Sequence, residues 1–233
     1  MGKRSIAPAK RPELEGFEWP QRRLEDATTA FSQMPDGRLE LTVEHQRLNG
    51  ISCDMLCWWF GVYAFLEVDL GAHVAQAFSV WHPRDHIDIR PFLVTQMMPS
   101  NPGDYIVMEE AYGAEPSYRT IEKFKIVHRD TSKYAIEVYR AGLRVAGLEY
   151  SFEAHPDGTD VVSCLWVGVE RGWSRILINN LVVPFLFDVK KTEAWMQHNV
   201  EEIGALEHLL PILYERRSEG RRITWPTPTD GAF

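Results

Sequence analysis

The sequence of 233 residues predicts an α+β fold in which one curved antiparallel sheet packs around a long C-terminal helix. Short segments of alternating apolar and polar residues follow one another through the middle of the chain, and turn signals separate them. Residues 192–214 have the apolar spacing of an amphipathic helix. Strands collected together with helices beside them are typical of this class, and we expect an apolar cavity between sheet and helix.

The N-terminal residues 1–30 contain three prolines among charged residues and are expected to form an arm or a wrapped extension. Residues 31–233 are expected to form a single domain. Its first strand is predicted at 39–43, where apolar and polar residues alternate, and Asn49-Gly50 marks the turn that follows. Ser52 can then cap a helix that carries Leu56 and Trp59 on one face.

Further short strands are expected downstream of this helix. They are predicted at 78–81, 105–112, 124–128, 134–139, 143–152 and 161–168. Turn signals at 130–132, 141–142 and 156–158 lie between the later ones and predict an antiparallel arrangement with short connections.

Composition disfavours several classes of function. Hydrophobic residues make up 45% and charged residues 25% of the chain, as in ordinary globular proteins, and the net charge of −8 disfavours a nucleic-acid partner. The longest apolar run, 176–187, is shorter than the ~20 residues of a membrane span and is expected to be buried, so no membrane association is predicted. Residues 1–10 lack the apolar segment of a secretory signal, and the three cysteines indicate reduced thiols, so we expect a cytoplasmic protein.

The C-terminal helix carries two ionisable residues inside its apolar stripe. His198 and Glu202 are four residues apart, so both side chains lie on one face, close enough to bind the same metal ion. Two other interpretations remain open. The two residues could form a buried hydrogen-bonded pair, or the helix could be rotated so that both reach water.

Two further clusters have side chains suited to metal binding. The loop from His82 to His86 contains two histidines four residues apart, with Asp85 available to orient an imidazole. Alternatively, its polar residues only cap the adjoining strand. Glu109 and Glu110 lie on a predicted strand, where alternation sends one carboxylate to each face of the sheet.

These motifs resemble the 2,4-diacetylphloroglucinol hydrolase family, which includes phloretin hydrolases. The resemblance lies in Asp54-Met55 followed by Trp58-Trp59-Phe60, then Trp81-His82-Pro83-x-x-His86, and then His198-x-x-x-Glu202, and it covers about residues 35–215. It implies a helix-grip (Bet v 1-like) fold with a zinc ion held by two His and two Glu. It also implies hydrolysis of the carbon–carbon bond between an acyl group and a polyhydroxylated ring.

The resemblance assigns the zinc ligands residue by residue. His86 matches the first ligand, and His198 and Glu202 match the pair on the helix. The strand ligand is Glu110 or, as the alternative, Glu109, with Glu115 and Glu122 as weaker candidates. The chain departs from the family at Phe78, where related enzymes have a tyrosine, so the preference for acyl phloroglucinols is in doubt.

The chemistry expected at such a site is attack of water on an acyl carbonyl, with the ring carbon leaving as a stabilised carbanion equivalent that takes up a proton. Candidate residues for supplying this proton or orienting the ring are His82, Asp85, His128 and Tyr150, beside Phe78. The expected partner is a small aromatic ketone. Two other functions remain open: a metal-free carrier of a hydrophobic aromatic molecule, and a cyclase or lyase that uses acid–base residues alone. The oligomeric state is also open, and a homodimer is one of the assemblies that the sequence allows.

Overall fold

The computed structural model describes residues 14, 19–93, 100–172, 175–183 and 189–226. Within these residues, nine strands form one antiparallel sheet in the order β1-β2-β11-β10-β9-β8-β7-β6, and β3 also pairs with β11. The strands are β1 Thr28–Gln33, β2 Leu39–Glu44, β3 Leu48–Asn49, β6 His86–Leu93, β7 Tyr105–Ala111, β8 Arg119–Arg129, β9 Lys133–Arg140, β10 Leu143–His155 and β11 Gly158–Val167.

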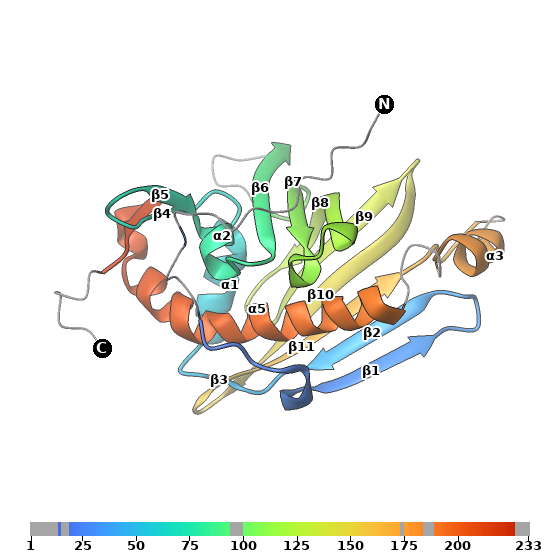
Figure 1. Ribbon diagram of the computed structural model, residues 1–233, viewed down its shortest axis with the longest axis horizontal. Helices are drawn as coiled ribbons and strands as arrows, with labels where there is room; N and C mark the ends of the chain where they lie inside the picture. The colour runs from blue at the N-terminus through green and yellow to red at the C-terminus, as the bar shows by residue number, and fades with distance from the viewer. Residues whose placement is uncertain (1–13, 15–18, 94–99, 173–174, 184–188, 227–233) are drawn as a thin grey trace.

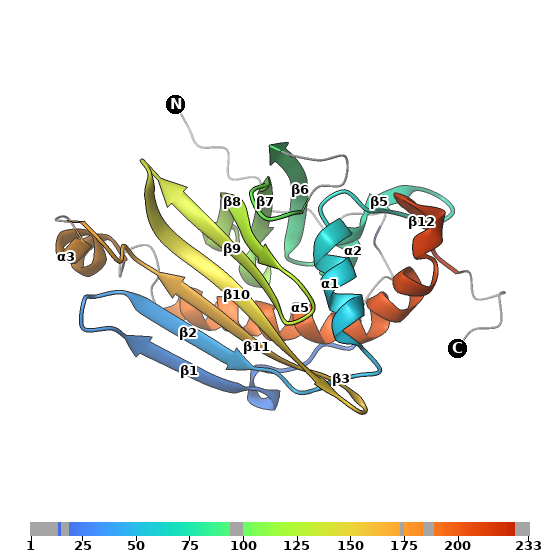
Figure 2. The same cartoon turned by 180° about the vertical axis from the view of Figure 1, so that it is seen from behind.

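The long helix α5, Val189–Glu215, crosses one face of this sheet (Figure 1). Helix α1, Cys53–Val62, and the short helix α2, Ala77–Trp81, lie beside its C-terminal half. In the view from behind, the sheet lies in front of α5 (Figure 2). A short helix α3, Arg175–Leu177, continues as a π-helical segment, Ile178–Val182. A small sheet joins β12 Arg222–Thr224, β4 Glu67–Asp69 and β5 Val74–Gln76.

The main strands and helices follow from local sequence. In β2 the burial alternates along the strand, with Leu39, Leu41 and Val43 facing the core. Helix α1 begins after Ser52, whose hydroxyl accepts a hydrogen bond from the backbone N–H of Met55 at 3.2 Å, as expected for an N-cap. The predicted sheet, the predicted long helix and the α+β class are therefore confirmed.

Aromatic side chains fill the space between α1 and the sheet. The ring of Phe60 stacks on Tyr134 and Tyr150, with centroids 4.4 and 5.2 Å apart, and lies parallel to Phe152 at 5.9 Å. The hydroxyls of Tyr63 and Tyr134 are hydrogen-bonded at 3.0 Å in this interior. The inner face of the sheet is thus lined by aromatic rings that carry a few buried hydroxyls.

Three sequence-based expectations are corrected by the structure. Residues 78–81 form helix α2 and not a strand. All four are buried, the polar Ser79 included, so the segment has no periodicity that could distinguish the two. Strand β1 begins at Thr28, so the sheet extends into the segment expected to be an arm. In the apolar run 176–187, Ile176 and Leu177 are 59% and 61% exposed, whereas 184–188 lie outside the described residues.

Among the described residues, no helix combines the length and the apolarity that a membrane span requires.

Candidate metal centre

Helix α5 supplies two of the side chains that meet beneath the sheet. His198 and Glu202 are both buried, and their Nε2 and Oε2 atoms lie 3.8 Å apart across one turn of the helix. Helix α5 is buried on nearly all sides along this part, because α2, α1 and the sheet surround it. The interpretation in which the helix turns both residues to water is therefore excluded.

The edge of the sheet supplies the other two side chains. His86 is the first residue of β6 and pairs across the strands with Glu110 of β7. The Nε2 atom of His86 lies 3.6 Å from Oε1 of Glu110 and 3.5 Å from Oε2 of Glu202, and Nε2 of His198 lies 4.0 Å from Oε1 of Glu110. Two imidazole nitrogens and two carboxylate oxygens thus converge on one point.

Alternation along β7 separates the two neighbouring glutamates. Glu109 points to the other face of the sheet, where it forms an ion pair with Arg119. Glu115 accepts hydrogen bonds from Ser117, and Glu122 forms an ion pair with Arg140, so neither belongs to the converging group. Of the four candidate glutamates, the structure places Glu110 alone beside His86.

Each of the two histidines is oriented by a hydrogen bond at its Nδ1 atom. His86 Nδ1 lies 2.8 Å from the carbonyl oxygen of Phe78, and His198 Nδ1 lies 3.0 Å from Oδ2 of Asp85. An acceptor at Nδ1 fixes the proton there and leaves the lone pair of Nε2 facing the centre, which is the arrangement found around histidine ligands of metals. The ring of Phe78 also stacks on His86, with centroids 3.9 Å apart.

The two glutamates are oriented in the same manner. Oε1 of Glu202 accepts hydrogen bonds from the Tyr150 hydroxyl and from the Asn199 side-chain amide, both at 2.8 Å, which leaves Oε2 facing the centre. The Tyr112 hydroxyl lies 3.5 Å from Oε2 of Glu110, the oxygen that is not directed at the histidines. All four converging side chains therefore present one ligand atom and are held through another.

Burial shifts the pKa values of two of these groups, and a cation would reverse the shift of Glu110 and reinforce that of His198. Burial and the neighbouring charges of Glu202 and Asp85 raise the pKa of Glu110 to about 8. Burial lowers the pKa of His198, against the opposing effect of the Asp85 hydrogen bond. A cation would favour both the charged Glu110 and the neutral His198, which are the forms that bind metals.

The donor set fits a zinc ion. Mixed imidazole and carboxylate ligands suit zinc, and bonds of ~2.0–2.2 Å in a tetrahedral site place neighbouring ligand atoms about 3.4 Å apart. The four separations between an imidazole nitrogen and a carboxylate oxygen, 3.5, 3.6, 3.8 and 4.0 Å, are close to this value.

Asp85 is buried beside the centre but is already saturated with donors. Its carboxylate accepts hydrogen bonds from the backbone N–H groups of Gly113 and Ala114 and from the side chains of Arg84 and His198. Burial raises the pKa of Asp85, but these hydrogen bonds and charges outweigh it and hold the pKa well below its usual range. The ligand atoms of His86, Glu110 and His198 all lie within 4.8 Å of one another, and His82, Asp85 and His198 form a second such group, which we interpret as the support of the first.

The remaining predicted residues have different surroundings. His82 is buried, and its Nε2 atom lies 3.1 Å from the carboxylate of Glu201, which also pairs with Arg84. Tyr150 contacts Glu202 as described. His128 is a correction: it lies at the end of β8, where it is half-exposed and forms an ion pair with Asp130 at 2.7 Å, so it does not contribute to this centre.

Sequence reasoning missed several residues that support the centre. Tyr112, Asn199 and the backbone of Gly113 were not singled out. Asn199 lies three residues before Glu202 and therefore on the same helix face, which is a signal that could have revealed it. The others come from segments that only the folded sheet brings together.

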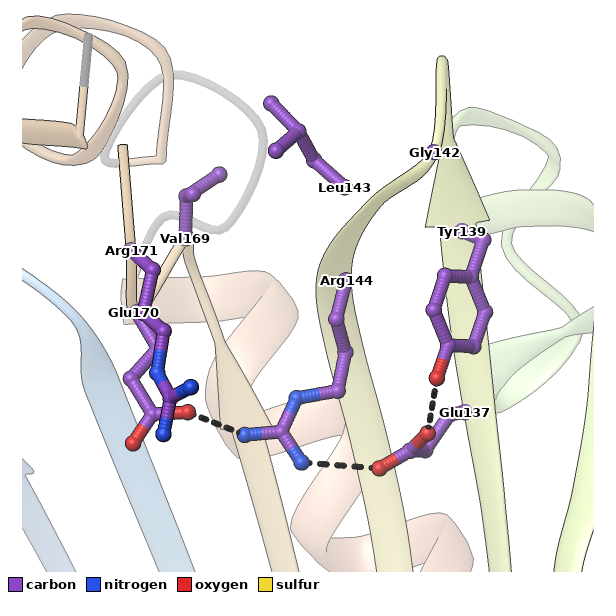
Figure 3. A pocket seen from close by; sticks show the side chains of 8 residues that line it. All are labelled: Glu137, Tyr139, Gly142, Leu143, Arg144, Val169, Glu170 and Arg171. Atoms are coloured by element: carbon purple, nitrogen blue, oxygen red, sulfur yellow. Dashed lines mark hydrogen bonds and ion pairs between the residues drawn. The ribbon is translucent and has the colours of Figure 1, made fainter. Parts of the chain in front are cut away.

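A separate surface pocket of about 410 Å³ lies over β9, β10 and the segment after β11 (Figure 3). Arg144 crosses it and forms ion pairs with Glu137 and Glu170, while the Tyr139 hydroxyl donates to Glu137 at 2.6 Å. Arg144 thus connects β10 to β9 and to the segment after β11, and we interpret this cluster as structural.

Comparison with known proteins supports the fold and leaves the chemistry open. No family model and no curated protein matches the chain. Major latex-like protein 151 from Panax ginseng is similar in structure, with a TM-score of 0.50 at 8% sequence identity over 74% of this chain and 97% of that chain. Protein Ms6760 from Mycobacterium smegmatis gives a TM-score of 0.43 at 13% identity over 77% and 96%. The di-domain ARO/CYC StfQ from the steffimycin biosynthetic pathway gives 0.42 at 10% identity over 74% and 52%.

The sheet and the long helix, together with the likeness to major latex-like protein 151, define the helix-grip (Bet v 1-like) fold.

Proposed function

We propose that this protein is a zinc-dependent hydrolase that cleaves the carbon–carbon bond between an acyl group and a phenolic ring. The observation that carries the proposal is the convergence of His86, Glu110, His198 and Glu202, each held through its other polar atom. The motif resemblance supports the reaction class, and the aromatic interior beside the centre supports an aromatic substrate.

A bound zinc ion would supply Lewis acidity, which lowers the pKa of water and polarises a carbonyl group. In the overall reaction, water adds to the acyl carbonyl, the bond from the carbonyl carbon to the ring breaks, the acyl group leaves as a carboxylic acid, and the ring carbon takes up a proton.

The chain's own residues set the protonation states for this reaction. Burial and the charge of Glu202 raise the pKa of Tyr150 well above its usual value, so its hydroxyl keeps its proton and donates to Glu202. Asp85 is held ionised and therefore cannot act as an acid. With His128 outside the centre and the Tyr150 proton engaged by Glu202, His82 is the predicted residue that remains as a proton donor to the ring carbon, and Tyr150 remains as a residue that orients the ring.

Phe78 bears on the choice of substrate. Its ring is buried among Tyr63, Trp81 and His86 and carries no hydroxyl that could bond to the substrate. We expect a preference for acyl phenols or β-diketone-like ketones with fewer ring hydroxyls than diacetylphloroglucinol, because an apolar side chain forms no hydrogen bond with a substrate hydroxyl.

The substitution Phe78→Tyr tests this preference. It should shift kcat/KM toward the more hydroxylated ketone by about 1–2 kcal/mol, roughly one neutral hydrogen bond. The measurement is a panel of aryl ketones that differ only in ring hydroxyls, assayed with both proteins. Unchanged ratios would show that Phe78 does not face the substrate.

The metal is tested by elemental analysis of the purified protein. The wild type should carry stoichiometric zinc, whereas His86→Ala, His198→Ala and Glu202→Ala should each lose most of it and all hydrolysis, with far-UV circular dichroism unchanged. His128→Ala is the matched control, because its imidazole lies outside the centre, and should retain both. Full zinc occupancy in His198→Ala would contradict the proposed site.

A wild type that takes up no zinc would favour a metal-free binding protein, and turnover that survives a chelator would favour the acid–base cyclase or lyase.

A further inference from the structure

A chain of buried polar groups leads from Glu202 away from the metal centre. Asn199 is fully buried on α5, and its side-chain amide donates to Oε1 of Glu202 at 2.8 Å and to the Tyr150 hydroxyl at 3.1 Å. Its Oδ1 atom is buried on the opposite side of the amide and has no hydrogen-bond partner among the residues that the structure describes. A buried amide oxygen without a partner costs about 1–3 kcal/mol, so a donor is expected nearby.

His45 supplies the complementary atom. It follows β2 directly, and its Nε2 atom lies 2.7 Å from the hydroxyl of Ser163, which is fully buried on β11. Its Nδ1 atom is buried and likewise has no partner within the described part of the chain. Burial and the charge of Arg22 lower the pKa of His45 to about 3, against the opposing effect of the Asn199 side chain, so the imidazole is neutral and carries a single proton.

The positions of the partners decide where that proton lies. The hydroxyl of Ser163 can either donate or accept, and can therefore serve Nε2 as a donor. Nδ1 is then the protonated nitrogen. Ser163 pairs across the strands with Tyr150, whose hydroxyl contacts Asn199, and the buried acceptor on this side of the sheet that lacks a donor is Oδ1 of Asn199. With the opposite orientation of the amide, Oδ1 would face the Glu202 carboxylate, and two acceptors would oppose each other.

We propose that His45 and Asn199 are positioning residues of the metal centre, with His45 Nδ1–H holding Asn199 Oδ1 so that the amide N–H is directed to Glu202. This inference rests on the proposed metal site. The amide and the Tyr150 hydroxyl then occupy Oε1 of Glu202, and Oε2 is left as the single ligand atom. His45 thus controls Glu202 through one intermediate side chain and touches neither the ion nor the substrate.

The test measures zinc affinity by chelator competition on the full chain. Asn199→Leu and His45→Gln should weaken zinc binding by about 10–100-fold, the usual effect of losing a partner that orients a ligand. The Gln side chain places its amide where Nε2 lies, whereas Asn places it where Nδ1 lies. His45→Asn should therefore bind zinc within about threefold of the wild type. His155→Ala, at the exposed end of β10, is the control and should have no effect.

A second measurement tests the hydrogen bond between His45 and Asn199 in the absence of metal. The ¹⁵N chemical shifts of His45 in the zinc-free protein should show a proton on Nδ1, and this proton should redistribute between the two nitrogens in Asn199→Leu. Thermal melts of the zinc-free variants separate loss of folding from loss of affinity.

The outcomes distinguish this inference from the proposed function. Wild-type zinc affinity in both His45→Gln and Asn199→Leu, or equal loss in His45→Asn and His45→Gln, would overturn the positioning role while the metal site stands. A proton found on Nε2 of wild-type His45 would overturn it as well. Absence of zinc binding in the wild type and in every variant would instead overturn the proposed function, and the role of His45 with it.

Discussion

At the scale of single residues, Asp85 organises the support of the proposed metal centre. Its buried carboxylate accepts hydrogen bonds from the backbone N–H groups of Gly113 and Ala114 and from the imidazole of His198 on α5. A carboxylate in this position fixes the histidine tautomer and makes the other nitrogen a better ligand.

Replacing this carboxylate should therefore weaken metal binding without removing a ligand. We expect Asp85→Asn to lower zinc affinity by about 10–100-fold, because an amide no longer offers acceptors to every donor around it. Chelator competition measures the effect. Glu109→Gln is the control, since this residue forms its ion pair on the other face of β7, and a similar loss in that variant would contradict the assignment.

Glu110 gives the zinc-free protein a distinct pH dependence. Its pKa is raised from 4.5 to about 8, so the folded state binds a proton that the unfolded state has already lost between these pH values. The stability of the zinc-free protein should fall as the pH rises from about 5 to 8, and the effect should be complete above pH 8. In Glu110→Gln this contribution is absent, so the variant should gain stability relative to the wild type as the pH increases. Urea unfolding at pH 5, 6.5 and 8 measures the difference, and parallel pH profiles would contradict the raised pKa.

At the scale of the element, helix α5 is more deeply enclosed than its sequence predicts. The pattern places Glu201 off the apolar stripe with the solvated residues. In the structure Glu201 is buried and paired with His82, Arg84 and Gln197. Burial alone would raise its pKa, but these partners outweigh burial and lower it. The middle of the helix thus has two polar faces that are both inside the protein.

Substitutions along α5 should separate these environments. Leu206→Asp and Leu209→Asp should destabilise the protein by several kcal/mol, on the order of a buried unpaired charge, because both side chains are fully buried. Glu201→Ala should also be destabilising, by about 1–3 kcal/mol, because it leaves the buried His82 without its carboxylate partner, while Arg84 keeps its contact with Asp85. Thermal melts measure both effects, with the exposed Glu193→Ala as the control. A silent Glu201→Ala would show that this pairing contributes little.

At the scale of the whole molecule, hydrogen bonds of Asn179 link the segment after β11 to the hairpin between β1 and β2. Its side chain is fully buried and bonds both the N–H and the carbonyl of Val169, at 2.7 and 3.0 Å, as well as the carbonyl of Asp36 at 2.9 Å. The hairpin turn can approach this closely because Gly37 has no side chain: a Cβ there would lie 2.8 Å from Oδ1 of Asn180.

Removing these hydrogen bonds should destabilise one end of the sheet. We expect Asn179→Ala to lower the free energy of unfolding by about 1–3 kcal/mol for each buried backbone group left without a partner. Asn180→Ala, which loses a single bond to the carbonyl of Ile176 at an exposed position, is the control. Chemical denaturation measures the difference, and equal stability of the two variants would contradict the role assigned to Asn179.

The sequence by itself determined the elements whose signal is local. Period-two alternation specified β2 and the strands from β7 to β11, the cap at Ser52 specified the start of α1, and the spacing of apolar residues specified α5. It also placed His198 and Glu202 on one helix face, because a separation of four residues has only one geometric outcome in a helix.

Only the tertiary structure decided what lacks such a signal. Strand β1 is exposed on both faces and therefore has no alternation, and residues 77–81 are buried throughout and show no period. The choice of Glu110 over Glu109 depends on which face of β7 turns toward α5, and the bond from Asp85 to His198 joins positions 113 residues apart. Such contacts follow from strand register and from packing between distant elements, which a local pattern of apolar and polar residues does not encode.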